Sequence, residues 1–199
     1  MVVAYSGLGG SSVSGVTISV PGLPPIIVLN EEQPADRLRF TLAHELGHLV
    51  MHHFPNAEME TEANEFASAL LMPRNDVLVA LRGRLDLRRL AALKPEWRVS
   101  MQALLYRAQS LGLIEKQQAG WLWRQFNANR IKLREPPELD FPPEQPGVIA
   151  RMVRLHVDTF GYSTGELANL LHVYEKQLAE FYDLNATAAV PGLRLRVVR

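Results

Sequence analysis

The chain has 199 residues, of which 47% are apolar and 21% charged, with no cysteine and a formal net charge of zero. These values are typical of a soluble globular protein, and they exclude disulfides, thiolate metal ligands and a cysteine nucleophile. The charge balance does not favour a nucleic-acid binder, which usually carries a basic excess, and no apolar run approaches the ~18 residues of a membrane span.

Two β-rich runs predict a hairpin near the N-terminus. Val16–Val20 and Ile26–Leu29 are rich in β-branched residues and are separated by a Pro/Gly segment that suits a longer turn. Residues 5–15, before them, are rich in glycine and serine and are expected to form a loop. We expect the run at 26–29 to be an edge strand, where it could pair with an extended peptide.

Helical periodicity begins directly after the hairpin. Apolar residues recur three or four positions apart from Pro34 to His53 and again from about Ala57 to Met72, so each segment predicts an amphipathic helix. Residues 76–133 predict several more helices, with a break expected at Lys94-Pro95 because proline disrupts a helix interior. Residues 148–183 are again helical in pattern, ahead of a tail that runs to the C-terminus.

The sequence His44-Glu45-Leu46-Gly47-His48 is an HExxH motif inside the first predicted helix. Residues four positions apart project from one face of a helix, so both histidines can bind a single tetrahedral zinc ion. Glu45 is rotated by about 100° from His44, so it flanks the metal. There it can accept a proton as the catalytic base.

The next predicted helix offers a third ligand. Its apolar residues form one face, and Glu60 lies roughly 60° from the centre of that face, against roughly 100° for Glu62. Glu60 is therefore the predicted ligand and Glu62 the alternative, although a carboxylate near a helix N-terminus is also favoured by the helix dipole. Asn64, one turn after Glu60, borders the same arc and is expected to hydrogen-bond the ligating groups.

Four other polar residues are considered for the site, but their sequence patterns are less specific. His52 continues the stripe of the motif histidines, but it lies about 12 Å along the helix axis from His44, which puts it out of reach of a shared ion. We expect His52 and His53 to be solvated residues at the helix end. Tyr106 and Arg107 are candidates for stabilising an oxyanion, with packing as the alternative role for Tyr106.

The stretch RFTLAHELGHLVMH at residues 39–52, followed by E-x-x-A-N-x-F-A-x-x-L-L-M-P at residues 60–73, resembles the ImmA/IrrE-type metallopeptidases. The likeness is strong over about residues 24–73. It implies a zinc ion held by both motif histidines and by a glutamate of the next helix. In this family the glutamate lies thirteen residues before the LLMP proline, a position that falls on Glu60.

The resemblance also implies a function. Such peptidases perform cytoplasmic, regulated proteolysis, commonly of helix-turn-helix repressors. We therefore expect a cytoplasmic zinc-dependent endopeptidase with a protein substrate of that kind and no membrane partner. Residues 87–108 resemble the helix-turn-helix-like segment that follows the protease core. The alternative is a DNA- or protein-binding regulatory module in which zinc only braces the fold, but a structural zinc site has no need for Glu45.

Strands followed by many helices predict an α+β fold, with a small β-sheet built on the hairpin, a zincin-like helical core and a mostly helical C-terminal region. Five prolines in residues 134–147 predict a stiff, extended connector. We expect four parts: the zinc peptidase core at 1–75, a helical, helix-turn-helix-like region at 76–133, the connector at 134–147, and a C-terminal helical segment with its tail at 148–199.

Overall fold

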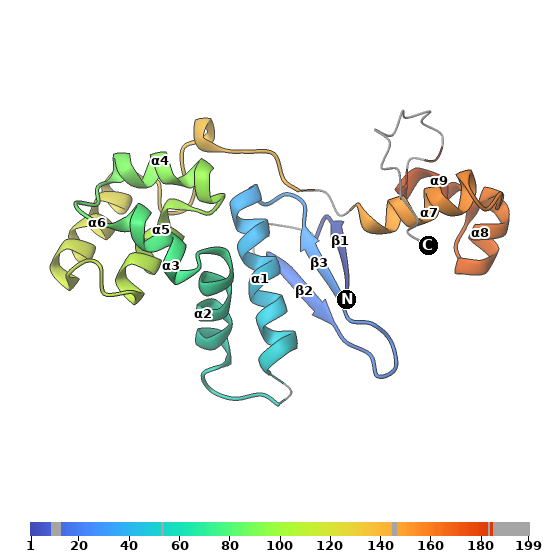
Figure 1. The fold of residues 1–199 in the computed structure, drawn as a ribbon, viewed down its shortest axis with the longest axis horizontal. Helices are drawn as coiled ribbons and strands as arrows, with labels where there is room; N and C mark the ends of the chain where they lie inside the picture. Colours follow the sequence, from blue (N-terminus) through green and yellow to red (C-terminus); the bar gives the residue numbers. More distant parts are fainter. Residues whose placement is uncertain (9–12, 53, 145–146, 183, 185–199) are drawn as a thin grey trace, which may run out of the picture. The chain divides into compact units, whose positions relative to one another are not determined.

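A computed structural model of the chain describes residues 1–8, 13–52, 54–144, 147–182 and 184. The fold is mixed α+β, as predicted, with a three-stranded sheet followed by helices (Figure 1). The chain forms two compact units, Met1–Glu144 and Gln145–Arg199. The four-part division stays a prediction. His53 lies outside the described residues, and so does the tail that begins at Asn185.

Each unit has its own set of elements. The first contains β1 (Val2–Ser6), β2 (Gly15–Ile18), β3 (Ile26–Asn30), α1 (Ala35–Met51), α2 (Met59–Leu71), α3 (Arg74–Leu81), α4 (Leu87–Trp97), α5 (Met101–Ser110), α6 (Lys116–Ala128) and the 3-10 turn η1 (Pro137–Leu139). The second contains α7 (Val148–Asp158), α8 (Thr164–Leu171) and α9 (Glu175–Phe181). None of the described helices is both long and apolar enough to cross a membrane.

The sheet has the strand order β1-β3-β2, with β3 antiparallel to β2 and parallel to β1. The hairpin prediction is confirmed, because β2 and β3 pair from Gly15↔Leu29 to Ile18↔Ile26. The prediction that residues 26–29 form an edge strand is wrong, since β3 is hydrogen-bonded on both sides. The edge strand that lies next to α1 is β2. The sequence did not predict β1, whose pairing with β3 makes β3 the central strand.

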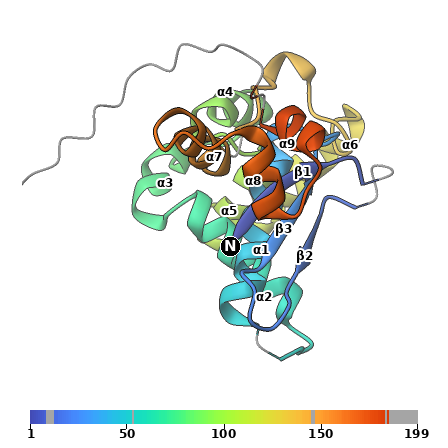
Figure 2. The ribbon, with the colours of Figure 1, turned by 90° about the vertical axis from the view of Figure 1, so that its right-hand side faces the viewer.

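The helix α1 lies between the sheet and α2, and Figure 2 shows it from a second side. Two glycines allow this close packing. A Cβ atom on Gly15 would lie 2.7 Å from Cγ2 of Thr41, and one on Gly47 would lie 3.3 Å from Cα of Ala63. Both distances are too short for a side chain to fit without a shift of its neighbours, so these glycines let β2 and α2 approach α1.

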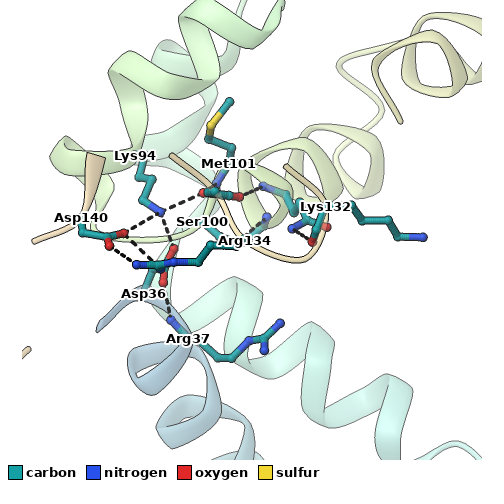
Figure 3. A network of polar contacts seen from close by, with 11 residues as sticks. Asp36, Arg37, Lys94, Ser100, Met101, Lys132, Arg134 and Asp140 are labelled. Atoms are coloured by element: carbon teal, nitrogen blue, oxygen red, sulfur yellow. Dashed lines mark hydrogen bonds and ion pairs between the residues drawn. The ribbon is translucent and has the colours of Figure 1, made fainter. Parts of the chain in front are cut away.

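A buried ion network ties α1, α4 and the segment after α6 together (Figure 3). The ammonium group of Lys94 lies 2.7 Å from a carboxylate oxygen of Asp36 and 2.9 Å from one of Glu135. Glu135 also accepts hydrogen bonds from the backbone N–H groups of Met101 and Gln102, at the start of α5. Charges this deeply buried are tolerated because each has a partner of opposite sign.

Two predictions for this region need correction. The break expected at Lys94-Pro95 is wrong, because α4 continues to Trp97. The residues Leu90 and Leu93 anchor it in the core, and Lys94 is held by its ion pairs, so packing offsets the hydrogen bond that proline cannot make. The segment expected to be only an extended connector contains the 3-10 turn Pro137–Leu139, and its Glu135 is buried.

The described part of the second unit contains three helices. Its helices α7, α8 and α9 enclose a core of Val153, Leu167, Ala168 and Leu178, and α8 and α9 lie side by side in both views (Figures 1 and 2). Ser163 and Glu166 form a capping box at the start of α8, which satisfies backbone donors that a helix end leaves free.

Candidate metal centre

The antiparallel pair α1 and α2 brings the three predicted ligands together. The Nε2 atoms of His44 and His48 lie 2.9 Å apart. One carboxylate oxygen of Glu60 lies 3.4 Å from Nε2 of His44, and the other lies 3.4 Å from Nε2 of His48. The side chains of His44 and His48 are each 17% exposed and that of Glu60 is 71% exposed, so the group opens to solvent on the side of Glu60.

The donor atoms of this group fit a metal ion. Asn64 Oδ1 lies 3.1 Å from Nδ1 of His44, and because that oxygen can only accept, the ring nitrogen donates. This leaves the Nε2 lone pair of His44 free to bind a cation, with Nε2 of His48 2.9 Å away. Burial, together with the neighbouring ring of His44, lowers the pKa of His48, which favours the neutral imidazole that metals bind.

Two neutral imidazoles and one carboxylate are a typical ligand set for zinc and leave one coordination position for water or substrate. The structure thus assigns His44, His48 and Glu60 as a group that could hold a metal ion, all three ligand atoms lying within 4.8 Å of one another.

The prediction that His52 is a solvated helix-end residue is wrong. Its side chain is 2% exposed, and both ring nitrogens are engaged. Nδ1 lies 2.9 Å from Nδ1 of His48, and Nε2 lies 2.9 Å from a carboxylate oxygen of Glu62. Hydrogen bonds from His52 and, second, from Asn56 lower the pKa of Glu62. Glu62, the alternative ligand, therefore lies at the outer end of a chain of contacts that orients the His48 ring.

The carboxylate of the predicted base Glu45 lies towards β2. Its carboxylate accepts a hydrogen bond of 2.5 Å from the hydroxyl of Thr17. Thr17 was not identified from the sequence, where the only signal was a polar residue between apolar ones on a strand. Its role depends on β2 packing against α1, which Gly15 permits. The structure thus fixes one carboxylate oxygen of Glu45 through Thr17.

The two oxyanion candidates have different surroundings. Nε of Arg107 donates to the backbone carbonyl of Met72 at 3.0 Å, and burial, followed by the charge of Arg74, lowers its pKa. Arg107 therefore holds the end of α2. Tyr106 is 44% exposed and lines a cavity that also touches Asn64.

Comparing Glu60→Gln with Glu62→Gln tests the ligand assignment. Loss of a residue that only supports a ligand typically costs ~10–100-fold in metal affinity, so loss of the Glu60 charge should cost ~100-fold. Glu62→Gln keeps an oxygen that can accept from Nε2 of His52, and we expect a change of less than ~10-fold. Competition with a chromophoric chelator measures both. The assignment is reversed if Glu62→Gln is the variant that releases the metal.

A comparison with protein-family models identifies the domain that contains these residues. The model of the IrrE N-terminal-like domain of the M78 peptidases matches residues 1–109, which include His44, Glu45, His48 and Glu60. No curated protein matches the chain.

Proposed function

The chain belongs to the M78 peptidase family with the IrrE N-terminal-like domain, and from this premise we propose that it is a zinc-dependent endopeptidase. One observation carries the proposal. Glu45, a carboxylate outside the His44, His48, Glu60 group, directly follows His44 in the chain and accepts a hydrogen bond from Thr17. A zinc ion that only braces a fold has no need for such a group.

In this mechanism His44, His48 and Glu60 would hold the metal. A zinc ion bound there would act as a Lewis acid, polarising the peptide carbonyl and lowering the pKa of a bound water to about 7. Glu45 would accept a proton from the attacking water on one carboxylate oxygen, while Thr17 holds the other. Glu45 then returns the proton to the leaving amine, which would otherwise be too basic to depart.

The edge strand β2 supports a site for an extended substrate. Among the described residues, β2 has a strand neighbour only on the side of β3. Its other edge leaves backbone N–H and C=O groups that can pair with a peptide, the usual way in which an edge strand binds an extended chain. Because Thr17 of β2 touches Glu45, a peptide paired there passes the catalytic base.

The alternative of a zinc-braced DNA-binding module receives less support. The α4 and α5 pair does have a helix-turn-helix-like corner, with Arg98 in the left-handed region (φ 53°) and Ser100 capping α5. The start of α5 is where such a helix would meet DNA. Here Glu135 occupies it, bonded to the N–H groups of Met101 and Gln102.

We further propose that the enzyme acts in the cytoplasm and that its substrate is a helix-turn-helix repressor. This rests on the resemblance of residues 24–73 to peptidases of that kind.

The test uses purified protein, a proteome-derived peptide library and repressors encoded beside its gene, with mass spectrometry to detect new peptide termini. We expect cleavage by the zinc-loaded protein, loss of cleavage after chelation, and recovery when stoichiometric zinc is added. A chain that binds one zinc ion tightly and yields no new termini from any of these substrates would contradict the peptidase proposal.

A further inference from the structure

A cavity of about 360 Å³ opens beside the metal centre, in the first unit. It lies among α1, α2, α5 and α6, and its lining includes Phe40, Asn64 and Ser68. Phe40 precedes His44 by one helical turn, so the cavity begins ~6 Å along the helix axis from that ligand. An extended peptide rises ~3.3 Å per residue. A substrate held at the metal would therefore place a side chain here within one or two residues of the bond that is cut.

One residue that lines the cavity carries an unpaired polar group. The side-chain hydroxyl of Ser68 is buried, the residue is 2% exposed, and among the described residues it has no hydrogen-bond partner. Other polar groups in the lining are already engaged: Ser100 caps α5, and Gln102 Nε2 donates to the carbonyl of Lys132. An unpaired buried hydroxyl costs free energy unless a ligand or water satisfies it.

The walls indicate the chemistry of the occupant. Phe40, Tyr106 and Trp123 supply aromatic surface, and Trp123 is fixed by a 2.8 Å hydrogen bond from its Nε1 to Gln109. Aromatic rings pack well against one another in offset or edge-to-face arrangements. Arg37 is the one charged residue among the described residues that line the cavity, and it disfavours a lysine or arginine occupant.

From these features we infer that the cavity binds an aromatic side chain of the substrate next to the scissile bond, with tyrosine preferred because its hydroxyl can pair with the Ser68 hydroxyl once that side chain rotates towards the cavity. The inference rests on the proposed peptidase function and adds the specificity of the site. Asn64 lines the cavity and also bonds Nδ1 of His44. An occupant therefore touches the residue that orients a metal ligand.

Two variants test the Ser68 hydrogen bond and the size of the cavity separately. Ser68→Ala removes the hydroxyl, so cleavage at tyrosine sites should fall about threefold to tenfold relative to matched phenylalanine sites, which is the contribution of one hydrogen bond. Ala103→Leu reduces the space on the α5 side and should shift cleavage towards smaller residues. Ser110→Ala makes the same chemical change outside the cavity and should leave the profile unaltered. All three should bind zinc normally, because none is a proposed ligand.

A binding measurement that needs no catalysis completes the test. The zinc-loaded protein, labelled with 5-fluorotryptophan, is titrated with N-acetyl-tyrosinamide or N-acetyl-phenylalaninamide and followed by ¹⁹F NMR, with Trp123→Phe assigning the resonance. We expect the Trp123 signal to shift with both probes, and Ser68→Ala to weaken only the tyrosine probe.

The outcomes distinguish the two proposals. Glu45-dependent cleavage without an aromatic preference, or with a Tyr/Phe ratio unchanged in Ser68→Ala, overturns the pocket and leaves the peptidase standing. Binding of the tyrosine probe through Ser68 without cleavage of any substrate retains the aromatic pocket and overturns the peptidase.

Discussion

Replacing Glu45 with glutamine should lower peptide cleavage by ~100-fold to 10,000-fold, the usual worth of a positioned general base. The amide has the size of the carboxylate and can still accept the hydrogen bond from Thr17, but it cannot accept a proton. Since His44, His48 and Glu60 are unchanged, metal content and thermal stability should match those of the parent protein. Steady-state cleavage, metal analysis and thermal unfolding measure the three quantities.

Glu65→Gln is the matched control, because Glu65 is an exposed carboxylate on α2 outside the metal-ligand group. It should leave cleavage unchanged. If Glu45→Gln retains full cleavage with full metal occupancy, the base has been assigned wrongly. If it loses metal as well as activity, Glu45 contributes to binding the ion.

Replacing Lys94 with methionine should destabilise the first unit by about 3–5 kcal/mol, the typical cost of removing one partner of a buried ion pair. The Lys94 side chain is 1% exposed, and those of Asp36 and Glu135 are 8% and 5% exposed. Methionine fills much of the space, but it leaves two buried carboxylates without their cation. Urea unfolding followed by tryptophan fluorescence measures the loss, because all three tryptophans lie in this unit.

Lys132→Met is the control, since Lys132 is exposed and its substitution should change stability by less than ~0.5 kcal/mol. A loss below ~1 kcal/mol for Lys94→Met would show that the network contributes little.

The difference in unfolding free energy between the parent protein and Lys94→Met depends on pH through the pKa of Lys94. Burial disfavours its charged form, but the hydrogen bonds to Asp36 and Glu135 outweigh burial, and the pKa is raised. The contribution of a raised pKa is fully present below the unfolded value, ~10.4, and is lost as the pH rises through the folded value. The difference between parent and variant should therefore be constant from about pH 7 to 9.

The sequence by itself determined the features that depend on local geometry. A helical repeat of 3.6 residues fixes which side chains share a face. The spacing of His44 and His48 therefore predicted a common site. The angle between Glu60 and the apolar face of its helix distinguished Glu60 from Glu62 as the third ligand. The structure places Glu60 with the histidines and Glu62 with His52. The hairpin was also local, because its two strands are joined by one turn.

Only the tertiary structure decided the contacts between residues far apart in the chain. The pairing of β1 with β3 in parallel made β3 central and β2 the edge, and parallel pairing of distant segments leaves no short-range pattern. Lys94 joins Asp36, 58 residues away, so a lysine in an ordinary helical pattern became a buried ion. The same holds for Thr17 and Glu45, which are 28 residues apart and meet only because α1 packs on β2. Helical periodicity specifies directions around one axis, whereas these contacts depend on how separate axes pack.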